Sequence, residues 1–138
     1  ILNQLKNIMI LYGAYGSNLN DVQMRRRCPS AQFLQNINIR GWKLVFRGVA
    51  DIIRFPKAIT FFGLYSLTKN CELSLDKYED YPYLYTKKKI FSEQIGREIL
   101  VYIMNKRYKF GPPTLNYYKI IEQGYFERGL NYKSLTDA

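Results

Sequence analysis

The stretch that first indicates chemistry in this sequence is Tyr15-Gly16-Ser17-Asn18-Leu19. It follows an apolar segment over 8–14 and precedes a short polar segment with helical character. A loop between a strand and a helix presents backbone N–H groups to an anion, and the helix dipole adds positive potential there. Gly16 permits backbone angles that other residues avoid, and the small Ser17 lets a ligand approach. We interpret the stretch as an anion-binding loop; a purely structural turn is the alternative.

Acid–base chemistry in this chain must use groups other than imidazole, because the sequence contains no histidine. Ser-His-Asp and Cys-His nucleophilic mechanisms are therefore excluded, as are most zinc sites. Carboxylates, tyrosine, lysine and cysteine remain as candidates. Cys28 and Cys71 form no CxxC pair, and we expect both to be reduced, buried and structural. We expect neither a metal nor a cofactor.

Glu79 is the carboxylate best placed for a catalytic role. Cys71, Leu75 and Tyr78 recur at helical spacing, which predicts a helix over 70–79. Glu79 follows Leu75 by four residues, so it borders the face that packs inward, and it ends the helix. Desolvation and the negative end of the helix dipole both disfavour an ionised carboxylate, which raises its pKa from about 4.3 towards the range of a general base. A structural or solvent-facing glutamate is the alternative.

Four parts of the sequence follow one another in the order and spacing of a known family. They are 12–19 (YGAYGSNL), 27–31 (RCPSA), 63–65 (GLY) leading to 75–79 (LDKYE), and a C-terminal part with Pro112-Pro113, Tyr117, Lys119-Ile120-Ile121, Gly124 and Gly129-Leu130. In these motifs the chain resembles the gamma-glutamylcyclotransferase family over nearly its whole length. One such match has little weight, but four in the right order make chance improbable.

The resemblance implies a cofactor-independent enzyme that cyclises a gamma-glutamyl amino acid or amine to 5-oxoproline and releases the amine. Glu79 would take a proton from the substrate's alpha-ammonium group, so that the amine can attack its own side-chain carbonyl, and would then protonate the departing nitrogen. Because intramolecular attack has a high effective molarity, no covalent enzyme intermediate is implied. The loop 15–19 would bind the alpha-carboxylate or the oxyanion. Tyr85 and Tyr117 match the family's site tyrosines and would bond substrate through their hydroxyl groups.

The sequence departs from the family pattern directly after Glu79, where Asp80-Tyr81-Pro82 stands in place of a frequent glycine. A second carboxylate beside Glu79 would raise the pKa of Glu79 further if Asp80 pointed inward. The departure therefore bears on which amine the site accepts.

The elements that position these residues predict an α+β fold. Helices are expected from the N-cap Asn20 to Pro29, over 70–79, and from Pro112-Pro113-Thr114 to Gly124 as the C′ residue. Strands are expected over 8–14, 31–40, 42–47, 49–55, 58–65, 83–91 and 97–105, with turns at Gly41, Gly48 and Pro56-Lys57. The resemblance sharpens this to a small, mixed, mainly antiparallel and partly closed β-barrel with flanking helices, whose mouth carries the loop.

Length and hydropathy bound the organisation of the chain. With 138 residues, 47% of them hydrophobic, we expect one domain over 1–138, in which 1–8 can be an extension because the family pattern begins near Met9. No apolar stretch reaches the roughly 20 residues that span a bilayer, and no leader pattern is present, so we expect a soluble, cytoplasmic protein without a membrane partner. Its expected partner is a small gamma-glutamyl substrate.

The net charge of +10, together with 13 tyrosines, makes nucleic acid a partner to consider. However, the basic residues are dispersed, and the two densest runs, 25–27 and 87–89, fit solvated structural roles at a helix end and on an edge strand. No nucleic-acid-binding motif accompanies them, so specific nucleic-acid binding is not expected. Two alternatives to the enzyme stay open: a non-catalytic binder of a small anion such as a nucleotide, and a basic nucleic-acid-binding module. Glu79 favours the enzyme, because an anion binder gains nothing from a carboxylate.

Overall fold

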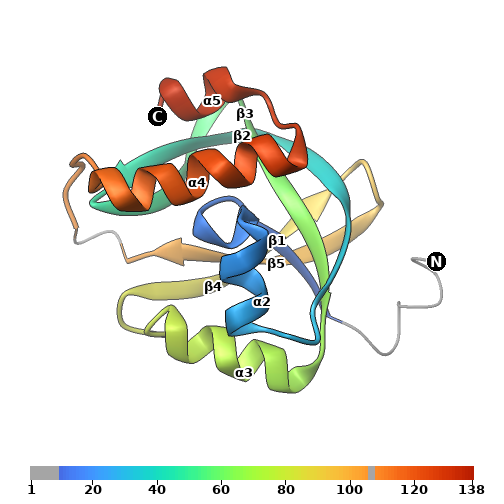
Figure 1. Cartoon of the computed structure of the whole chain (residues 1–138). Helices are drawn as coiled ribbons and strands as arrows, with labels where there is room; N and C mark the ends of the chain where they lie inside the picture. Colours follow the sequence, from blue (N-terminus) through green and yellow to red (C-terminus); the bar gives the residue numbers. More distant parts are fainter. Residues whose placement is uncertain (1–9, 106–107) are drawn as a thin grey trace.

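A five-stranded sheet with helices packed around it organises the chain (Figure 1). The computed structural model describes residues 10–105 and 108–138. The strands are β1 (Ile10–Ala14), β2 (Gln32–Arg47), β3 (Val49–Leu67), β4 (Tyr85–Ser92) and β5 (Arg97–Met104). The helices are the 3-10 helix η1 (Ser17–Leu19) and α2 (Asp21–Arg27), α3 (Lys69–Tyr78), α4 (Leu115–Arg128) and α5 (Tyr132–Thr136). The extension over 1–8, and the first two residues of the strand predicted over 8–14, lie outside the described residues.

The sheet has the order β2-β3-β1-β5-β4, in which β1 runs parallel to β5 and the other neighbours are antiparallel. The predicted α+β fold with a mixed, mainly antiparallel sheet is confirmed. The partly closed barrel is a correction, because no ladder between the described residues joins the edge strands β2 and β4. A side chain bridges these edges instead: Gln94 Oε1, in the turn after β4, accepts a hydrogen bond from the Asn38 N–H of β2 at 3.1 Å.

The four short strands predicted between residues 31 and 65 are in fact two long ones. Both β2 and β3 continue through a wide bulge, where pairing passes from Arg40–Ile59 to Trp42–Arg54. The intervening Gly41 has a φ of 88°, so it supplies the irregular backbone that the turn signal predicted without ending the strand. Gly48, with a φ of 79°, does reverse the chain between β2 and β3.

Asn20 and Thr114 cap helices α2 and α4, as the sequence predicts, whereas helix α5 was not predicted. The Asn20 side chain accepts a hydrogen bond from the Gln23 N–H at 3.2 Å, and α2 ends at Arg27, before Pro29. The predicted end of the last helix at Gly124 is wrong. Helix α4 continues to Arg128, and Gly129, with a φ of 64°, is its left-handed C-cap.

Gly124 serves close packing rather than helix termination. It lies where α4 crosses η1, and a Cβ built on it would lie 2.7 Å from Leu19 Cβ and 2.8 Å from Asn20 N. The hydrogen side chain therefore lets α4 contact the backbone of the loop after β1. Figure 1 shows this loop, between β1 and α2, lying against α4.

We expect Gly124→Ala to lower the free energy of unfolding, although alanine normally stabilises a helix interior by about 1 kcal/mol relative to glycine. The added methyl group meets the backbone of η1, which cannot move without disturbing the core, and such overpacking costs about 1–3 kcal/mol. Chemical denaturation measures the difference. The matched control is Gly111→Ala, where the new Cβ has open space. Equal stability of the two variants would contradict this packing role.

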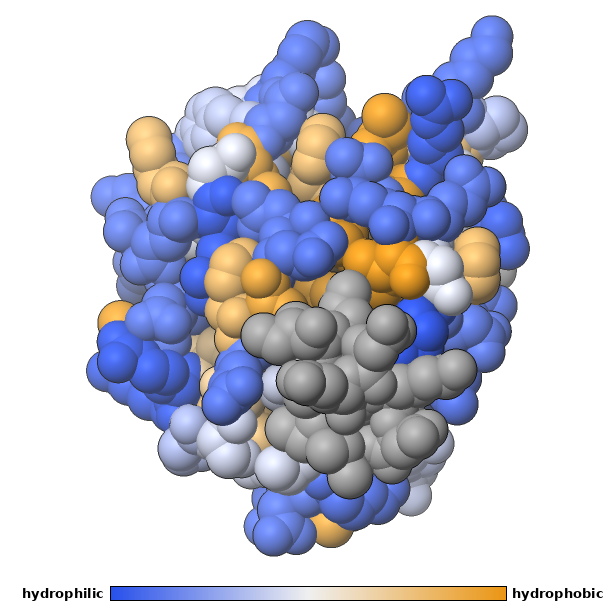
Figure 2. Space-filling view, turned by 90° about the vertical axis from the view of Figure 1, so that its right-hand side faces the viewer, coloured by the Kyte–Doolittle hydropathy of each residue, from blue (hydrophilic) through white to orange (hydrophobic). Residues whose placement is uncertain are grey.

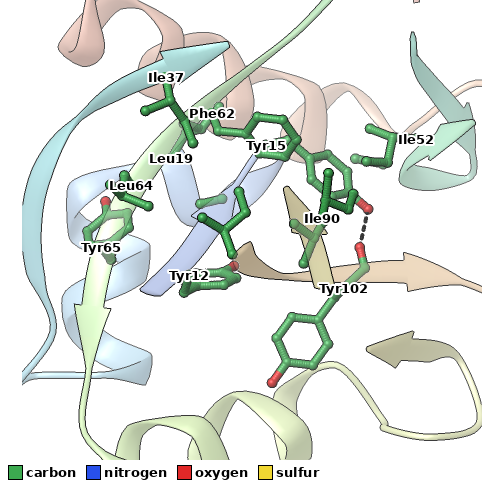
Figure 3. Close-up of a cluster of buried hydrophobic side chains, with 14 of the residues drawn as sticks. Tyr12, Tyr15, Leu19, Ile37, Ile52, Phe62, Leu64, Tyr65, Ile90 and Tyr102 are labelled. Atoms are coloured by element: carbon green, nitrogen blue, oxygen red, sulfur yellow. Dashed lines mark hydrogen bonds between the residues drawn. The ribbon is translucent and has the colours of Figure 1, made fainter. Parts of the chain in front are cut away.

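The core lies between the sheet and the helices, and part of it is shown in Figure 3. Leu19, Phe62 and Leu64 are fully buried there. Several tyrosines share the core, and the Tyr15 hydroxyl donates a hydrogen bond to the Tyr102 carbonyl at 2.6 Å (Figure 3). Cys28 and Cys71 are free and buried, as predicted.

The surface carries most of the charge. The coloured part of the face in Figure 2 is mainly hydrophilic, with apolar residues confined to limited areas. Within the described part of the chain, no helix combines the length and the hydropathy needed to cross a bilayer. The basic run 87–89 lies on the edge strand β4, as predicted, although Lys87 is not simply solvated: it pairs with Glu72 at 2.8 Å and Asp76 at 3.0 Å. The run 25–27 lies in the last turn of α2.

Candidate active site

A cavity of about 170 Å³ opens where the loop after β1 meets the C-terminal end of α3. Most of the predicted site residues line it: Tyr15, Gly16, Ser17, Asn18, Glu79, Tyr85 and Tyr117. Leu19 is the exception, because its side chain is fully buried in the core. Tyr15 and Tyr117, which are 102 positions apart in the sequence, thus line the same cavity.

The loop presents unpaired backbone donors. No described residue accepts a hydrogen bond from the backbone N–H of Ser17 or Asn18, which begin η1. The turn is closed instead by the Leu19 N–H, which donates to the Gly16 carbonyl at 3.0 Å. Gly16 has a φ of −119° and a ψ of −132°, a backbone conformation that is neither helical nor extended and that agrees with the expected need for glycine. A Cβ at Gly16 would lie 3.1 Å from Ala50 Cβ.

The side chains of this loop point into the protein and hold the backbone in place. Asn18 Nδ2 donates to the Tyr12 hydroxyl at 2.9 Å, and the Tyr65 hydroxyl donates to the Asn18 carbonyl at 3.2 Å. Arg27 donates to Ser17 Oγ at 3.0 Å and also to Asn18 Oδ1. The N–H donors are therefore oriented before any ligand arrives, as electrostatic stabilisation requires.

Glu79 is the C-cap residue of α3, and its backbone N–H donates to the Leu75 carbonyl at 2.8 Å. Burial raises the pKa of its carboxyl group to about 7, while the nearby positive charge of Arg27 opposes that rise. The direction of this pKa shift agrees with the prediction, and its cause is the predicted desolvation. Asp80 is exposed, with a φ of 51°, and does not line the cavity, so it does not supply the second inward carboxylate considered above.

Two tyrosine hydroxyls are fixed by the backbone of Ala50. The Tyr85 hydroxyl donates to the Ala50 carbonyl at 2.6 Å, and the Ala50 N–H donates to the Tyr117 hydroxyl at 3.2 Å. Each hydroxyl has one hydrogen. That of Tyr85 is already donated to Ala50, so Tyr85 can only accept a hydrogen bond from a ligand, whereas Tyr117 can still donate one. Burial raises the pKa of both, that of Tyr117 to about 12, so both remain protonated near neutral pH.

Comparison with known proteins adds evidence independent of this geometry. The chain is 31% identical over 137 residues to gamma-glutamylcyclotransferase from Homo sapiens, which covers 87% of this chain and 72% of the human protein. It belongs to the gamma-glutamylcyclotransferase family. A solved gamma-glutamyl cyclotransferase has a TM-score of 0.77 at 28% identity, over 94% of this chain and 85% of the other. An AIG2-like protein from Mus musculus, at 16% identity and a TM-score of 0.57 over 76% of this chain and 87% of the other, shares the fold alone. No family model matches the sequence.

Within this gamma-glutamylcyclotransferase fold, sequence reasoning did not identify four polar side chains at the site. Tyr12, Tyr78 and Tyr102 line the cavity, and Arg27 holds its loop. Membership of the matched motifs was a usable signal for Tyr12, Arg27 and Tyr78. Tyr102 has no such local signal, because only the pairing of β5 with β1 brings it to the cavity.

The polar groups of the cavity suit proton transfer and hydrogen bonding rather than metal binding. Among residues 10–105 and 108–138, no three carboxylate or cysteine side chains lie together as metal ligands would. The cavity instead combines one carboxylate, tyrosine hydroxyls and backbone amides. In this family member, these are the groups available to move a proton and to bind an anion.

Proposed function

We propose that this protein cyclises the gamma-glutamyl group of a small amino-acid or amine derivative to 5-oxoproline, with Glu79 as general base and then general acid. The observation that carries the proposal is that Glu79, with a pKa of about 7, lines one small cavity together with Ser17 and Asn18, from whose backbone N–H groups no described residue accepts a hydrogen bond. A proton acceptor poised near neutral pH and preoriented donors are the two requirements of this reaction.

The substrate's glutamyl part carries an alpha-ammonium and an alpha-carboxylate group. The loop N–H groups and the free hydrogen of Tyr117 suit the carboxylate or the developing oxyanion, whereas Tyr85 can accept a hydrogen bond from the ammonium group. Ionised Glu79 removes one proton from the ammonium group, which frees the nitrogen lone pair for attack.

Ring closure then forms a bond between the amine nitrogen and the side-chain carbonyl carbon. The carbonyl oxygen becomes an oxyanion, which preoriented donors stabilise more strongly than the neutral carbonyl. Protonated Glu79 gives its proton to the departing nitrogen, and the bond from that nitrogen to the carbonyl carbon breaks. The ring nitrogen sheds a second proton as it becomes an amide, and the carboxylate, ionised again, can take it up. The products are 5-oxoproline and the amine.

The size of the cavity favours an amino-acid-sized ligand over a nucleotide. Its volume, about 170 Å³, lies below the range of about 300–1,000 Å³ that is usual for larger ligands. The glutamyl group would fill it, and the amine would extend towards the half-exposed Tyr78.

A panel of gamma-glutamyl amino acids and amines tests this function directly. Each compound that reacts should give 5-oxoproline and free amine in equal amounts, and the corresponding alpha-glutamyl compounds should give no 5-oxoproline. No release from any compound would overturn the proposal. If, in addition, nucleic acid bound sequence-selectively and tightly above about 200 mM salt, the binding-module alternative would be favoured.

The raised pKa of Glu79 predicts an acid limb in the pH dependence of kcat/KM. The ionised carboxylate is the active form, so activity should fall as the pH drops through the pKa of about 7. An unperturbed glutamate would place the midpoint near about 4.3. Initial rates between about pH 5 and 8.5 at low substrate concentration give kcat/KM and locate the midpoint of its fall. Flat kcat/KM across the neutral range would contradict the assignment.

A further inference from the structure

Arg27 makes contacts that its place in a basic run does not suggest. Its neighbour Arg26 is exposed, but the Arg27 side chain is partly buried between α2 and the loop after β1. Nη1 donates to Ser17 Oγ at 3.0 Å and to Asn18 Oδ1, and Nη2 donates to Gln23 Oε1 at 2.8 Å. The expected solvated role is therefore wrong for this arginine, which binds two consecutive residues of the candidate anion-binding loop.

The same guanidinium group also contacts the end of α3. Its Cζ lies 3.5 Å from the centre of the Tyr78 ring, and Tyr78 immediately precedes Glu79. A planar guanidinium can stack on a ring and donate in its own plane at the same time, which an ammonium group cannot do. Arg27 thus connects the two halves of the site, the loop and the helix end that carries the carboxylate.

We propose that Arg27 is the positioning residue of this site, which fixes the loop at Ser17–Asn18 relative to Glu79 and keeps a positive charge beside that carboxylate. The inference rests on the proposed function for its catalytic consequence, but its geometric part concerns the unliganded protein. Arg27 itself need not touch substrate, because its donors are already directed to the loop and to Gln23.

The charge of Arg27 works against the burial of Glu79. Burial disfavours the ionised carboxylate, and Arg27 is the cation that stabilises it. Five tyrosines interact electrostatically with Glu79: Tyr12 of β1, Tyr15 of the loop, Tyr85 of β4, Tyr102 of β5 and Tyr117 of α4. Burial raises the pKa of each, so they stay neutral. Removal of the Arg27 charge should therefore raise the pKa of Glu79 further.

Three variants separate charge from geometry. Arg27→Gln removes both the charge and the stacked plane, whereas Arg27→Lys keeps the charge and loses the plane. Arg26→Gln is the matched control, because it makes the same charge change one residue away, at an exposed side chain. The first readout is the titration of the Glu79 carboxyl carbon by 13C NMR in unliganded protein, assigned with Glu79→Gln. The second is amide hydrogen exchange at Leu19 and Asn20, whose N–H groups close the loop by donating to the Gly16 carbonyl at 3.0 Å and the Ser17 carbonyl at 3.1 Å.

We expect Arg27→Gln to move the Glu79 titration to higher pH, to speed amide exchange in the loop, and to lower kcat/KM by about 10-fold to 100-fold, as misplacement of reacting groups does. Arg27→Lys should keep the titration near that of the wild type but still exchange faster and lose roughly tenfold in kcat/KM. Arg26→Gln should resemble the wild type in the Glu79 titration, in amide exchange and in kcat/KM.

The proposal is overturned if Arg27→Gln matches Arg26→Gln in both titration and loop exchange. If Arg27→Gln does not fold, Gln23→Leu and Arg27→Lys test the same contacts while the positive charge at position 27 is kept. Wild-type rates of amide exchange in both variants would overturn the proposal. If the wild type cyclises nothing, the proposed function fails, yet the titration and exchange still decide the role of Arg27. The two failures are thus distinguishable.

Discussion

Glu79→Gln is expected to lower turnover by about 100-fold to 10,000-fold, the usual contribution of a general acid–base group. Glutamine has nearly the same shape but accepts no proton at neutral pH, so the alpha-ammonium group would stay protonated and could not attack. The backbone bond from Glu79 to Leu75 does not involve the side chain, and the fold should therefore be retained. Steady-state 5-oxoproline release and binding of a gamma-glutamyl compound by calorimetry measure the two effects.

Asp80→Asn is the matched control for this experiment. It removes one negative charge at the next residue, where the side chain is exposed and outside the cavity. Its activity should stay close to that of the wild type. Wild-type turnover in the Glu79→Gln protein, or an equal loss in Asp80→Asn, would show that Glu79 is not the acid–base group.

Gly16→Val is expected to reduce kcat/KM by about 100-fold, because small displacements of positioning groups have effects of that size. The first added carbon would lie 3.1 Å from Ala50 Cβ and 3.6 Å from the Tyr117 hydroxyl, so a branched side chain would occupy the cavity. Ala50 holds both Tyr85 and Tyr117, and its displacement would disturb both hydroxyls. Affinity for 5-oxoproline, measured by calorimetry, should fall with kcat/KM.

The free energy of unfolding separates this loss from general damage. Gly16 lies at a partly exposed loop, and we expect a cost within the roughly 1–3 kcal/mol range of overpacking, which leaves the protein folded. Gly111→Val is the control, since an added Cβ there meets no atom within 4 Å. A folded Gly16→Val protein with wild-type affinity would count against the anion-binding role of the loop.

Part of the large positive charge is used inside the fold. Arg47 pairs with the buried Asp51 at 2.9 Å, and Arg128 donates to the Tyr65 hydroxyl at 2.7 Å. The Tyr65 hydroxyl in turn donates to the Asn18 carbonyl, so this arginine also supports the loop. These two arginines therefore have structural roles that do not require nucleic acid.

The sequence by itself determined the features that depend on neighbouring residues. Asn20 caps α2 because its side chain reaches the N–H three residues later, and the absence of histidine limits the acid–base groups whatever the fold. The loop after β1 and the place of Glu79 at the end of α3 were likewise predictable, since each follows from a short local pattern. The family motifs extended these predictions to Tyr85 and Tyr117.

Only the tertiary structure decided the features that depend on what lies opposite in space. Helix α4 crosses η1, so Leu19 faces the core and the loop backbone can approach Gly124 closely. This contact joins residues about 100 positions apart. Among the described residues, the edge strands β2 and β4 form no ladder with each other, so the sheet is open. No local sequence pattern encodes whether two edge strands pair. Arg27 acts on Ser17 and Glu79 because α2 ends between the loop and α3. Local patterns specify a backbone conformation, whereas the partners of a side chain follow from how the elements pack.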